Sequence, residues 1–221
     1  MSMALILNIE TSTKVCSVSL ALNGDVIAFK EESSEKYIHS EKLNIFIEEL
    51  FAQVDYQLND LAAICVSKGP GSYTGLRIGV SSAKGFCYAL DIPLISIDSL
   101  SVLARGYLNN NVMNANTILM PMIDARRMEV YTAVFNDKAD IQTAISAEVI
   151  DAEFFDTNKE IILIGDGAKK FNSIIPRNVR IENNLSSSKG MASLSYLKFT
   201  KKEFEDVAYF EPYYLKSFKL G

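Results

Sequence analysis

The sequence predicts an α/β protein with two lobes, of which the second is the smaller. Apolar or alternating strand-like segments repeatedly give way to segments with helical spacing. A polar, turn-rich stretch, residues 109–114, separates two such series. The chain has 221 residues, 48% of them hydrophobic, which is enough to bury a core in each lobe. We therefore expect one lobe over residues 1–106 and another over residues 107–206, with the tail 207–221 as a candidate to complete the first.

The chain opens with three strand-like segments. Residues 4–9 are apolar and β-branched, residues 15–21 alternate with period two, and residues 26–29 follow an Asn-Gly-Asp turn. A polar Glu-Thr-Ser-Thr turn, residues 10–13, joins the first two segments. This order predicts three antiparallel strands at the start of the first lobe.

The rest of the first lobe alternates between helices and strands. Helical spacing covers residues 35–54, and a strand follows over residues 61–66. A second helix is expected over residues 74–90, and after it a strand over residues 92–97. Ser99 is expected to cap a short helix that runs to residue 105.

The second lobe is expected to begin with two strands, residues 117–123 and 128–135, joined by an Asp-Ala-Arg-Arg turn. A strand over residues 161–164, a Gly-Asp-Gly turn and a helix from Ala168 follow. A longer helix is expected around residues 191–205.

The composition argues against a protein that binds nucleic acid by itself. The net charge is −5 and the pI is near 5.1, whereas such proteins usually present a basic face to phosphates. The N-terminus lacks the basic segment of a signal peptide, and no apolar run approaches the ~20 residues that span a bilayer. Three scattered cysteines, Cys16, Cys65 and Cys87, are typical of buried free thiols in a reducing compartment. We expect a cytoplasmic protein that does not contact a membrane.

A glycine-rich segment, Gly-Pro-Gly-Ser-Tyr-Thr-Gly-Leu-Arg-Ile-Gly at residues 69–79, joins a strand to a helix. Its glycines permit a tight turn, and Ser72 or Thr74 can cap the helix. The free N–H groups at such a helix N-terminus can receive a phosphate. A connection without any ligand is the alternative interpretation.

Small residues form a stripe along the same helix, at Gly75, Gly79, Ser82 and Ala83. An interior glycine costs a helix about 1 kcal/mol relative to alanine, so a helix that accepts it usually makes a close contact. That contact is either with the helix's own sheet or with a helix of a partner chain.

Several motifs of the chain resemble one known family. They follow in order along the sequence: Ile9-Glu10-Thr11-Ser12, His39-Ser40-Glu41, the segment 69–79, Ala83-Lys84-Gly85, Ser99-Leu100, the segment 125–131, and Gly165-Asp166-Gly167-Ala168. Together they resemble the TsaB family, also called YeaZ, from about residue 4 to the Pro-Tyr-Tyr-Leu-Lys tail at residues 212–216. This family serves threonylcarbamoyladenosine biosynthesis in bacteria and belongs to the TsaD (Gcp)-like superfamily. The chain departs from it at Glu10, where the family more often has aspartate.

The resemblance implies an actin-like ATPase fold, built on RNase H-like sheets, with a reduced second lobe. It also implies a non-catalytic platform in the complex that transfers a threonylcarbamoyl group to N6 of adenosine 37, in tRNAs reading codons that start with A. The implied partners are a TsaD-like catalytic subunit, in a heterodimer, and a TsaE-like ATPase. When alone, the chain is a candidate to form a homodimer, and it is expected to contact tRNA only through its partners. The resemblance implies no cofactor bound by this chain itself, while the complex is a candidate to bind ATP or ADP.

The residues that make the sibling TsaD a catalyst are replaced in this chain. TsaD follows its own Gly-Pro-Gly helix and a strand with His-x-x-x-His, whose histidines lie on one helix face and bind a metal. The same arrangement here places Ser99 and Leu103 at those positions, and leucine binds no metal. His39 is the only histidine, and no Gly-x-Ser-x-Gly segment supports a hydrolase triad. We therefore expect no catalytic residue and no metal site.

Two sets of residues are candidates for binding sites. Contact with a partner is expected on the first two long helices, at His39, Leu43, Gly75, Ile78, Gly79 and Ser82. Nucleotide or phosphate binding is expected in the turns, at Glu10, Thr11, Ser12, Gly71, Ser72, Thr74, Arg126, Gly165 and Gly167.

The phosphate loops leave an enzymatic alternative open. An actin-like nucleotide-binding ATPase or a kinase-like enzyme acting independently would use them, although only Glu10, Asp124 and Asp166 are candidates for holding Mg²⁺. Arg126 and Arg127 have two interpretations. They are either solvent-exposed surface arginines, or one of their guanidinium groups reaches across the cleft between the lobes to bind a phosphate or the partner. A purely structural homodimer is the third alternative.

Overall fold

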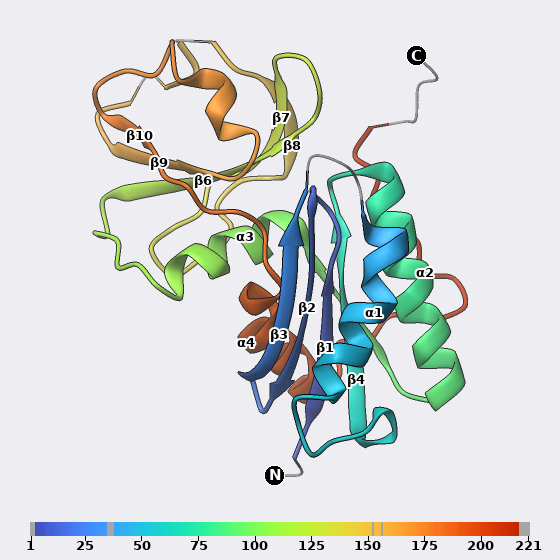
Figure 1. Ribbon diagram of the computed structural model, residues 1–221. Coiled ribbons are helices and arrows are strands. Elements are labelled where there is room, and N and C mark those ends of the chain that lie inside the picture. The colour runs from blue at the N-terminus through green and yellow to red at the C-terminus, as the bar shows by residue number, and fades with distance from the viewer. Residues whose placement is uncertain (1–2, 35–37, 152, 156, 217–221) are drawn as a thin grey trace.

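The computed structural model is an α/β protein with two lobes, each built on a mixed five-stranded sheet (Figure 1). It describes residues 3–34, 38–151, 153–155 and 157–216. The predicted fold class is confirmed. In these ranges no helix is both long and apolar enough to cross a membrane.

The sheet of the first lobe has the strand order β3-β2-β1-β4-β5. Its strands are β1 (Leu5–Glu10), β2 (Val15–Leu22), β3 (Asp25–Ser33), β4 (Leu61–Gly69) and β5 (Leu94–Asp98). The first three pair antiparallel, as predicted, while β1, β4 and β5 run parallel. Because β1 and β4 are parallel neighbours, the loops that follow them meet at the same edge of the sheet.

Helices cover both faces of this sheet. α1 (His39–Phe51) and α2 (Tyr73–Leu90) pack on one face, and α3 (Ser99–Leu108) and α4 (Ala192–Thr200) pack on the other (Figure 1). All six residues of β1 are buried, because a strand covered on both faces has no solvent side.

The position of α4 differs from the division expected from the sequence, which assigned residues 191–205 to the second lobe. The helix packs instead against β1 and β5 of the first lobe. Met191 and Leu194 bury the apolar face of the sheet around Ile6. The helix is also shorter than expected, because residues Ser188–Met191 form a 3₁₀ turn before it. The first lobe is thus assembled from both ends of the chain.

The sheet of the second lobe has the strand order β10-β9-β6-β7-β8. Its strands are β6 (Thr117–Asp124), β7 (Glu129–Thr132), β8 (Ser146–Val149), β9 (Glu160–Ile164) and β10 (Val179–Ile181). The expected helix from Ala168 is only the 3₁₀ turn η3 (Ala168–Phe171). The expected strand over residues 128–135 ends at Thr132, and Phe135 then pairs with Leu119 as an isolated bridge.

The helix α3 belongs to the cores of both lobes. Leu100, Leu103 and Tyr107 pack with the apolar residues of β6 and β9, whereas Val102 packs into the first lobe. Its N-cap is Asp98, not Ser99 as predicted, because the Asp98 Oδ1 accepts a hydrogen bond from the Ser101 N–H at 2.8 Å.

The described part of the C-terminal tail, residues 207–216, runs along the first lobe. Val207 and Phe210 pack against its core, and the Lys84 Nζ donates to the Phe210 carbonyl at 2.9 Å. The Tyr213 N–H donates to the Lys68 carbonyl at 2.7 Å. These contacts lead the tail to the space between the lobes.

Candidate functional site

A cleft of about 900 Å³ lies between the two lobes. It is lined by residues 12–14 and 70–74 of the first lobe, residues 123–127 of the second lobe, Asp166, and residues 213–216 of the tail. Of the predicted phosphate-loop residues, five line this cleft: Ser12, Gly71, Ser72, Thr74 and Arg126. The fold therefore brings together turns that are far apart in the sequence.

The loops after β1 and β4 are joined by backbone hydrogen bonds. The Ser72 N–H donates to the Ser12 carbonyl at 2.7 Å. Ser72 also caps α2, as predicted, because its Oγ accepts from the Gly75 N–H at 3.2 Å. The cleft thus receives the N-terminus of a helix of 18 residues, whose dipole favours an anion. The Ser12 Oγ beside it is buried and has no hydrogen-bond partner among the described residues.

Glu10 and Thr11 lie beneath the cleft rather than in its wall. Both side chains are fully buried. The Glu10 Oε1 accepts from the Ser12 N–H at 2.7 Å, and the Thr11 hydroxyl donates to the Gly75 carbonyl at 2.8 Å. Burial raises the pKa of Glu10, and the hydrogen bond from the Ser12 N–H partly opposes the shift. These two residues support the loop and do not face a ligand.

The facing turn of the second lobe presents two arginines to the cleft. Arg126 and Arg127 both have positive φ, 69° and 52°, and the Arg126 N–H donates to the Asp124 Oδ1 at 2.6 Å. Both side chains are exposed, and the structure gives neither guanidinium a hydrogen bond or ion pair with a described residue. An unpaired guanidinium at a cleft is suited to a phosphate or carboxylate.

The Gly-Asp-Gly turn contributes only its middle residue to the lining. Gly165 has a φ of 100°, and a Cβ there would lie 2.3 Å from the Met122 carbonyl oxygen. Gly165 and Gly167 therefore allow the turn to lie against β6, and Asp166 reaches the cleft. Its Oδ1 accepts from the Asp124 N–H at 3.0 Å, and burial raises the pKa of its carboxyl.

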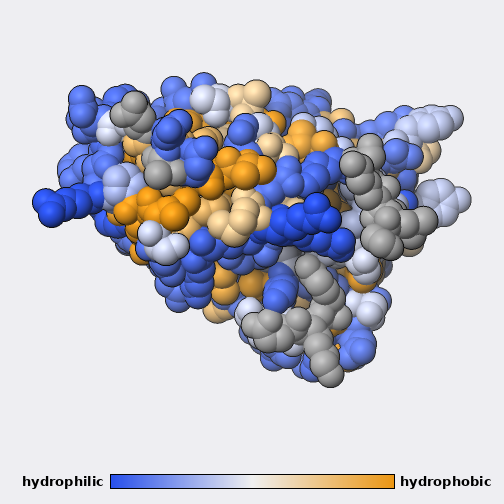
Figure 2. All heavy atoms as spheres, turned by 90° about the horizontal axis from the view of Figure 1, so that it is seen from above, coloured by the Kyte–Doolittle hydropathy of each residue, from blue (hydrophilic) through white to orange (hydrophobic). Residues whose placement is uncertain are grey.

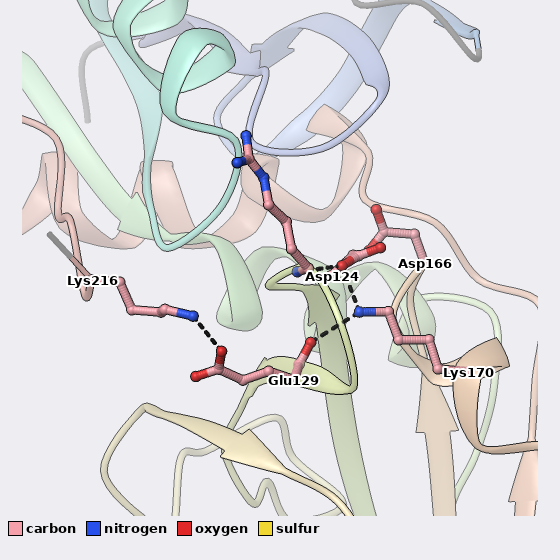
Figure 3. A network of polar contacts seen from close by, with 6 residues as sticks. Asp124, Glu129, Asp166, Lys170 and Lys216 are labelled. Carbon is pink, nitrogen blue, oxygen red and sulfur yellow. Dashed lines mark hydrogen bonds and ion pairs between the residues drawn. The ribbon is translucent and has the colours of Figure 1, made fainter. Parts of the chain in front are cut away.

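Two lysines complete a polar network at this wall of the cleft (Figure 3). The Lys170 Nζ contacts the Asp124 Oδ1 at 2.6 Å and donates to the Glu129 carbonyl at 3.0 Å. Lys216, from the tail, forms an ion pair with the Glu129 carboxylate (Figure 3). The sequence analysis missed Lys170, Glu129 and Lys216, because only the folded chain places η3, β7 and the tail together.

Tyrosines form the other part of the lining that the sequence analysis missed. Tyr73, Tyr131, Tyr213 and Tyr214 all line the cleft. The rings of Tyr73 and Tyr214 lie 4.9 Å apart, and the Arg77 guanidinium lies 4.2 Å from the Tyr73 ring centroid. The tail was expected as a candidate to complete the first lobe, and Val207 and Phe210 do pack there, but no local pattern placed its tyrosines in the cleft.

The predicted partner residues are mostly inside the molecule, which corrects the interpretation of the small-residue stripe. His39, Leu43, Gly75 and Gly79 are buried, while Ile78 and Ser82 are half-buried. A Cβ on Gly75 would lie 2.1 Å from the Thr11 carbonyl oxygen, and one on Gly79 would lie 2.2 Å from the Thr11 Oγ1. The stripe thus packs on the chain's own loop.

His39 has a structural position under the same loop. Its Nε2 lies 2.8 Å from the Thr13 carbonyl oxygen, and the side chain is fully buried. Burial lowers the pKa of His39, and the Thr13 carbonyl partly opposes the shift. The contact fixes the start of α1 against the floor of the cleft.

Ser99 and Leu103, which the sequence analysis compared with the metal ligands of TsaD, have packing roles. The Ser99 Oγ lies 2.7 Å from the Ser67 Oγ, and Leu103 is buried in the second-lobe core. Within the described ranges, no group of three or more His, Cys, Asp or Glu side chains gathers that could hold a metal ion.

Comparison with known proteins gives consistent relatives. The family model described as "TsaD: tRNA N6-adenosine threonylcarbamoyltransferase" matches residues 32–220. The tRNA threonylcarbamoyladenosine biosynthesis protein TsaB of Bacillus subtilis is 34% identical over 157 residues, which cover 70% of this chain and 66% of that protein. The TsaB protein of Escherichia coli is 26% identical, over 96% of this chain and 94% of that protein. The solved structure of YeaZ from Pseudomonas aeruginosa matches with a TM-score of 0.79 at 24% identity, over 96% of this chain and 100% of that one, a likeness of fold.

Proposed function

From the premise that this chain belongs to the TsaB family, we propose that it acts in tRNA threonylcarbamoyladenosine biosynthesis as a partner-binding subunit rather than as the catalyst. The observation that carries the proposal is the packing of Ser99 and Leu103, which leaves no metal-ligand pair at the position of the sibling's site. The proposed partner is a TsaD-like catalytic subunit, and a TsaE-like ATPase joins the complex.

The outer faces of α1 and α2 are the proposed docking surface. The two helices lie next to each other on one face of the first sheet (Figure 1). Ile45 of α1 is 48% exposed and Tyr88 of α2 is 86% exposed, while Ile78 and Ser82 of α2 are half-buried. Large apolar side chains on the outer face of a helix pair are typical anchors of an interface, which in a stable complex buries about 1,600 Å².

A second apolar surface lies elsewhere and supplies the control. Figure 2 shows hydrophobic side chains on the face that is uppermost in Figure 1, where the second lobe lies. Val149, at the end of the edge strand β8, is 69% exposed. The two surfaces can be tested separately because they lie on different lobes.

We expect Ile45→Glu and Tyr88→Glu each to weaken binding to the TsaD-like subunit by at least about tenfold, since a charge replaces an apolar anchor. Val149→Glu should leave the affinity unchanged. Calorimetric titration and size-exclusion chromatography of the mixed subunits measure these effects, and all three variants should keep the parental melting temperature. Binding lost in Val149→Glu and kept in the helix variants would move the interface to the second lobe. Chromatography of the chain alone tests the homodimer.

We further propose that the cleft binds a phosphorylated nucleoside, alone or in the complex. The observation in favour is the meeting of the α2 N-terminus with Arg126, Arg127 and the tyrosines in one cleft. An independent ATPase or kinase-like enzyme would use the same cleft, and nucleotide hydrolysis by the isolated chain would identify it.

A further inference from the structure

The carboxylates of the cleft already form hydrogen bonds or ion pairs within the chain. These contacts determine which groups are left to neutralise the charge of a bound phosphate. Enzymes that bind nucleoside triphosphates commonly offset the phosphate charge with Mg²⁺, which needs free carboxylate oxygens and keeps several waters. In this cleft the Asp124 Oδ1 accepts from both the Lys170 Nζ and the Arg126 N–H, each at 2.6 Å. Asp124 therefore already has a cation and a backbone donor on one of its two carboxylate oxygens, and a metal on the other oxygen would lie beside the Lys170 charge.

The remaining carboxylates are no better placed for a metal. The Asp166 Oδ1 accepts from the Asp124 N–H, and its side chain is desolvated. The Glu129 carboxylate pairs with Lys216 (Figure 3). Glu10 is fully buried and is not part of the lining. The residues of this cleft do not fit a Mg²⁺ site.

The Lys170 ammonium lies between the turn at residues 124–127 and β7, where a metal ion would otherwise have oxygen ligands. It is held by the Asp124 carboxylate and the Glu129 carbonyl, and its side chain is only 18% exposed. Two oxygen atoms that would otherwise be available to a metal thus contact a fixed side-chain charge. Beside the ion pairs Lys170–Asp124 and Lys216–Glu129, the cleft has two further positive charges, on Arg126 and Arg127.

We propose that the cleft binds a nucleoside phosphate without a divalent metal, with the phosphate charge met by Arg126 and Arg127. Planar guanidinium groups form paired, charge-assisted hydrogen bonds with phosphate oxygens. The buried Ser12 hydroxyl, which lacks a partner among the described residues, lies at the same loop as the α2 N-terminus. Tyr131 and Tyr213 offer rings on which a base stacks. The inference rests on the proposal that the cleft binds nucleotides.

The test uses ADP as the probe and the intact chain, alone and with its TsaD-like partner. Calorimetric titrations are compared in a buffer with EDTA and in one with excess Mg²⁺, and equal affinities are expected. Arg126→Ala combined with Arg127→Ala should weaken binding by about tenfold or more in both buffers, because each charge-assisted hydrogen bond contributes strongly. Arg177→Ala removes an exposed arginine outside the cleft lining and should change nothing. In the complex, the ADP binding that is lost in the double arginine variant is the binding by this chain, and the binding that remains belongs to the partner.

A second variant inverts the expected metal dependence. Lys170→Met removes the resident ammonium and frees the Asp124 carboxylate, so ADP binding should become stronger on adding Mg²⁺. Binding by the parental chain that appears only with Mg²⁺ and survives the double arginine substitution would overturn the metal-free site while leaving nucleotide binding intact. Absence of ADP binding in both buffers, with and without the partner, would overturn both proposals.

Discussion

Gly75→Ala is expected to destabilise the protein by up to about 2 kcal/mol, although alanine is the better helix former. The added Cβ would lie 2.1 Å from the Thr11 carbonyl oxygen and 3.1 Å from the His39 ring. A backbone oxygen cannot turn away as a flexible side chain can, so the loop after β1 or the start of α2 must shift. Overpacking of this kind costs typically 1–3 kcal/mol, which exceeds the gain in helix propensity of at most about 1 kcal/mol.

The matched control lies on the same helix. Gly85 is exposed, and a Cβ there would meet no atom within 4 Å. Gly85→Ala should therefore stabilise the protein by about 0.5–1 kcal/mol. Urea unfolding of both variants measures the difference, and an equal stabilisation by the two would contradict the close contact at Gly75. Since Gly79 is equally enclosed by Thr11, a bulky residue there is expected to disrupt the lobe and would not report on partner binding.

Glu10→Gln is expected to raise the free energy of unfolding by about 1–3 kcal/mol at neutral pH, because burial of an unpaired charge is costly. Glu10 is fully buried, and among the described residues its Oε2 has no hydrogen-bond partner and no cation forms an ion pair with it. Glutamine keeps an acceptor for the Ser12 N–H and removes the charge. A matched exposed change, Glu48→Gln on the outer face of α1, should have little effect.

The advantage of Glu10→Gln should depend on pH in a defined direction. The pKa of Glu10 is raised in the folded state, so folding takes up a proton between the unfolded value of about 4.3 and the folded value. The stability of the parental protein therefore falls as the pH rises through that window, and it stays lower above it. The difference between the variants should be largest at neutral pH and shrink toward pH 4. A difference that grows on acidification would contradict the proposed cost of the buried charge.

Local signals in the sequence were sufficient for most of the first lobe and for the loops of the cleft. The helix cap at Ser72 and the turn after β1 each follow a buried strand, so their meeting at one sheet edge could be anticipated. The glycine stripe of α2 was harder to interpret. Its pattern indicates that something approaches closely, but it does not distinguish Thr11 of the same chain from a partner helix.

Contacts between distant segments were not predictable from local patterns. The apolar face of α4 fits either sheet, and only the folded chain shows that it covers Ile6 and its neighbours. The pairing of Lys170 with Asp124 and of Lys216 with Glu129 joins residues 46 and 87 positions apart. Short strands such as β10, with three residues, carry too little periodicity to be recognised.

The placement of α4 has a consequence for the order in which a growing chain can fold. The strands of the first lobe are complete once β5 has been synthesised, but one face of their sheet is covered by α4, which begins at Ala192. At about 5–20 residues per second, ribosomal synthesis of the intervening ~90 residues takes roughly 5–20 s. During that time only α3, which contributes Val102, has been made of the covering layer that the structure describes. The nascent chain therefore presents Ile6, Ile95 and their neighbours to chaperones for many times the microseconds in which a helix forms.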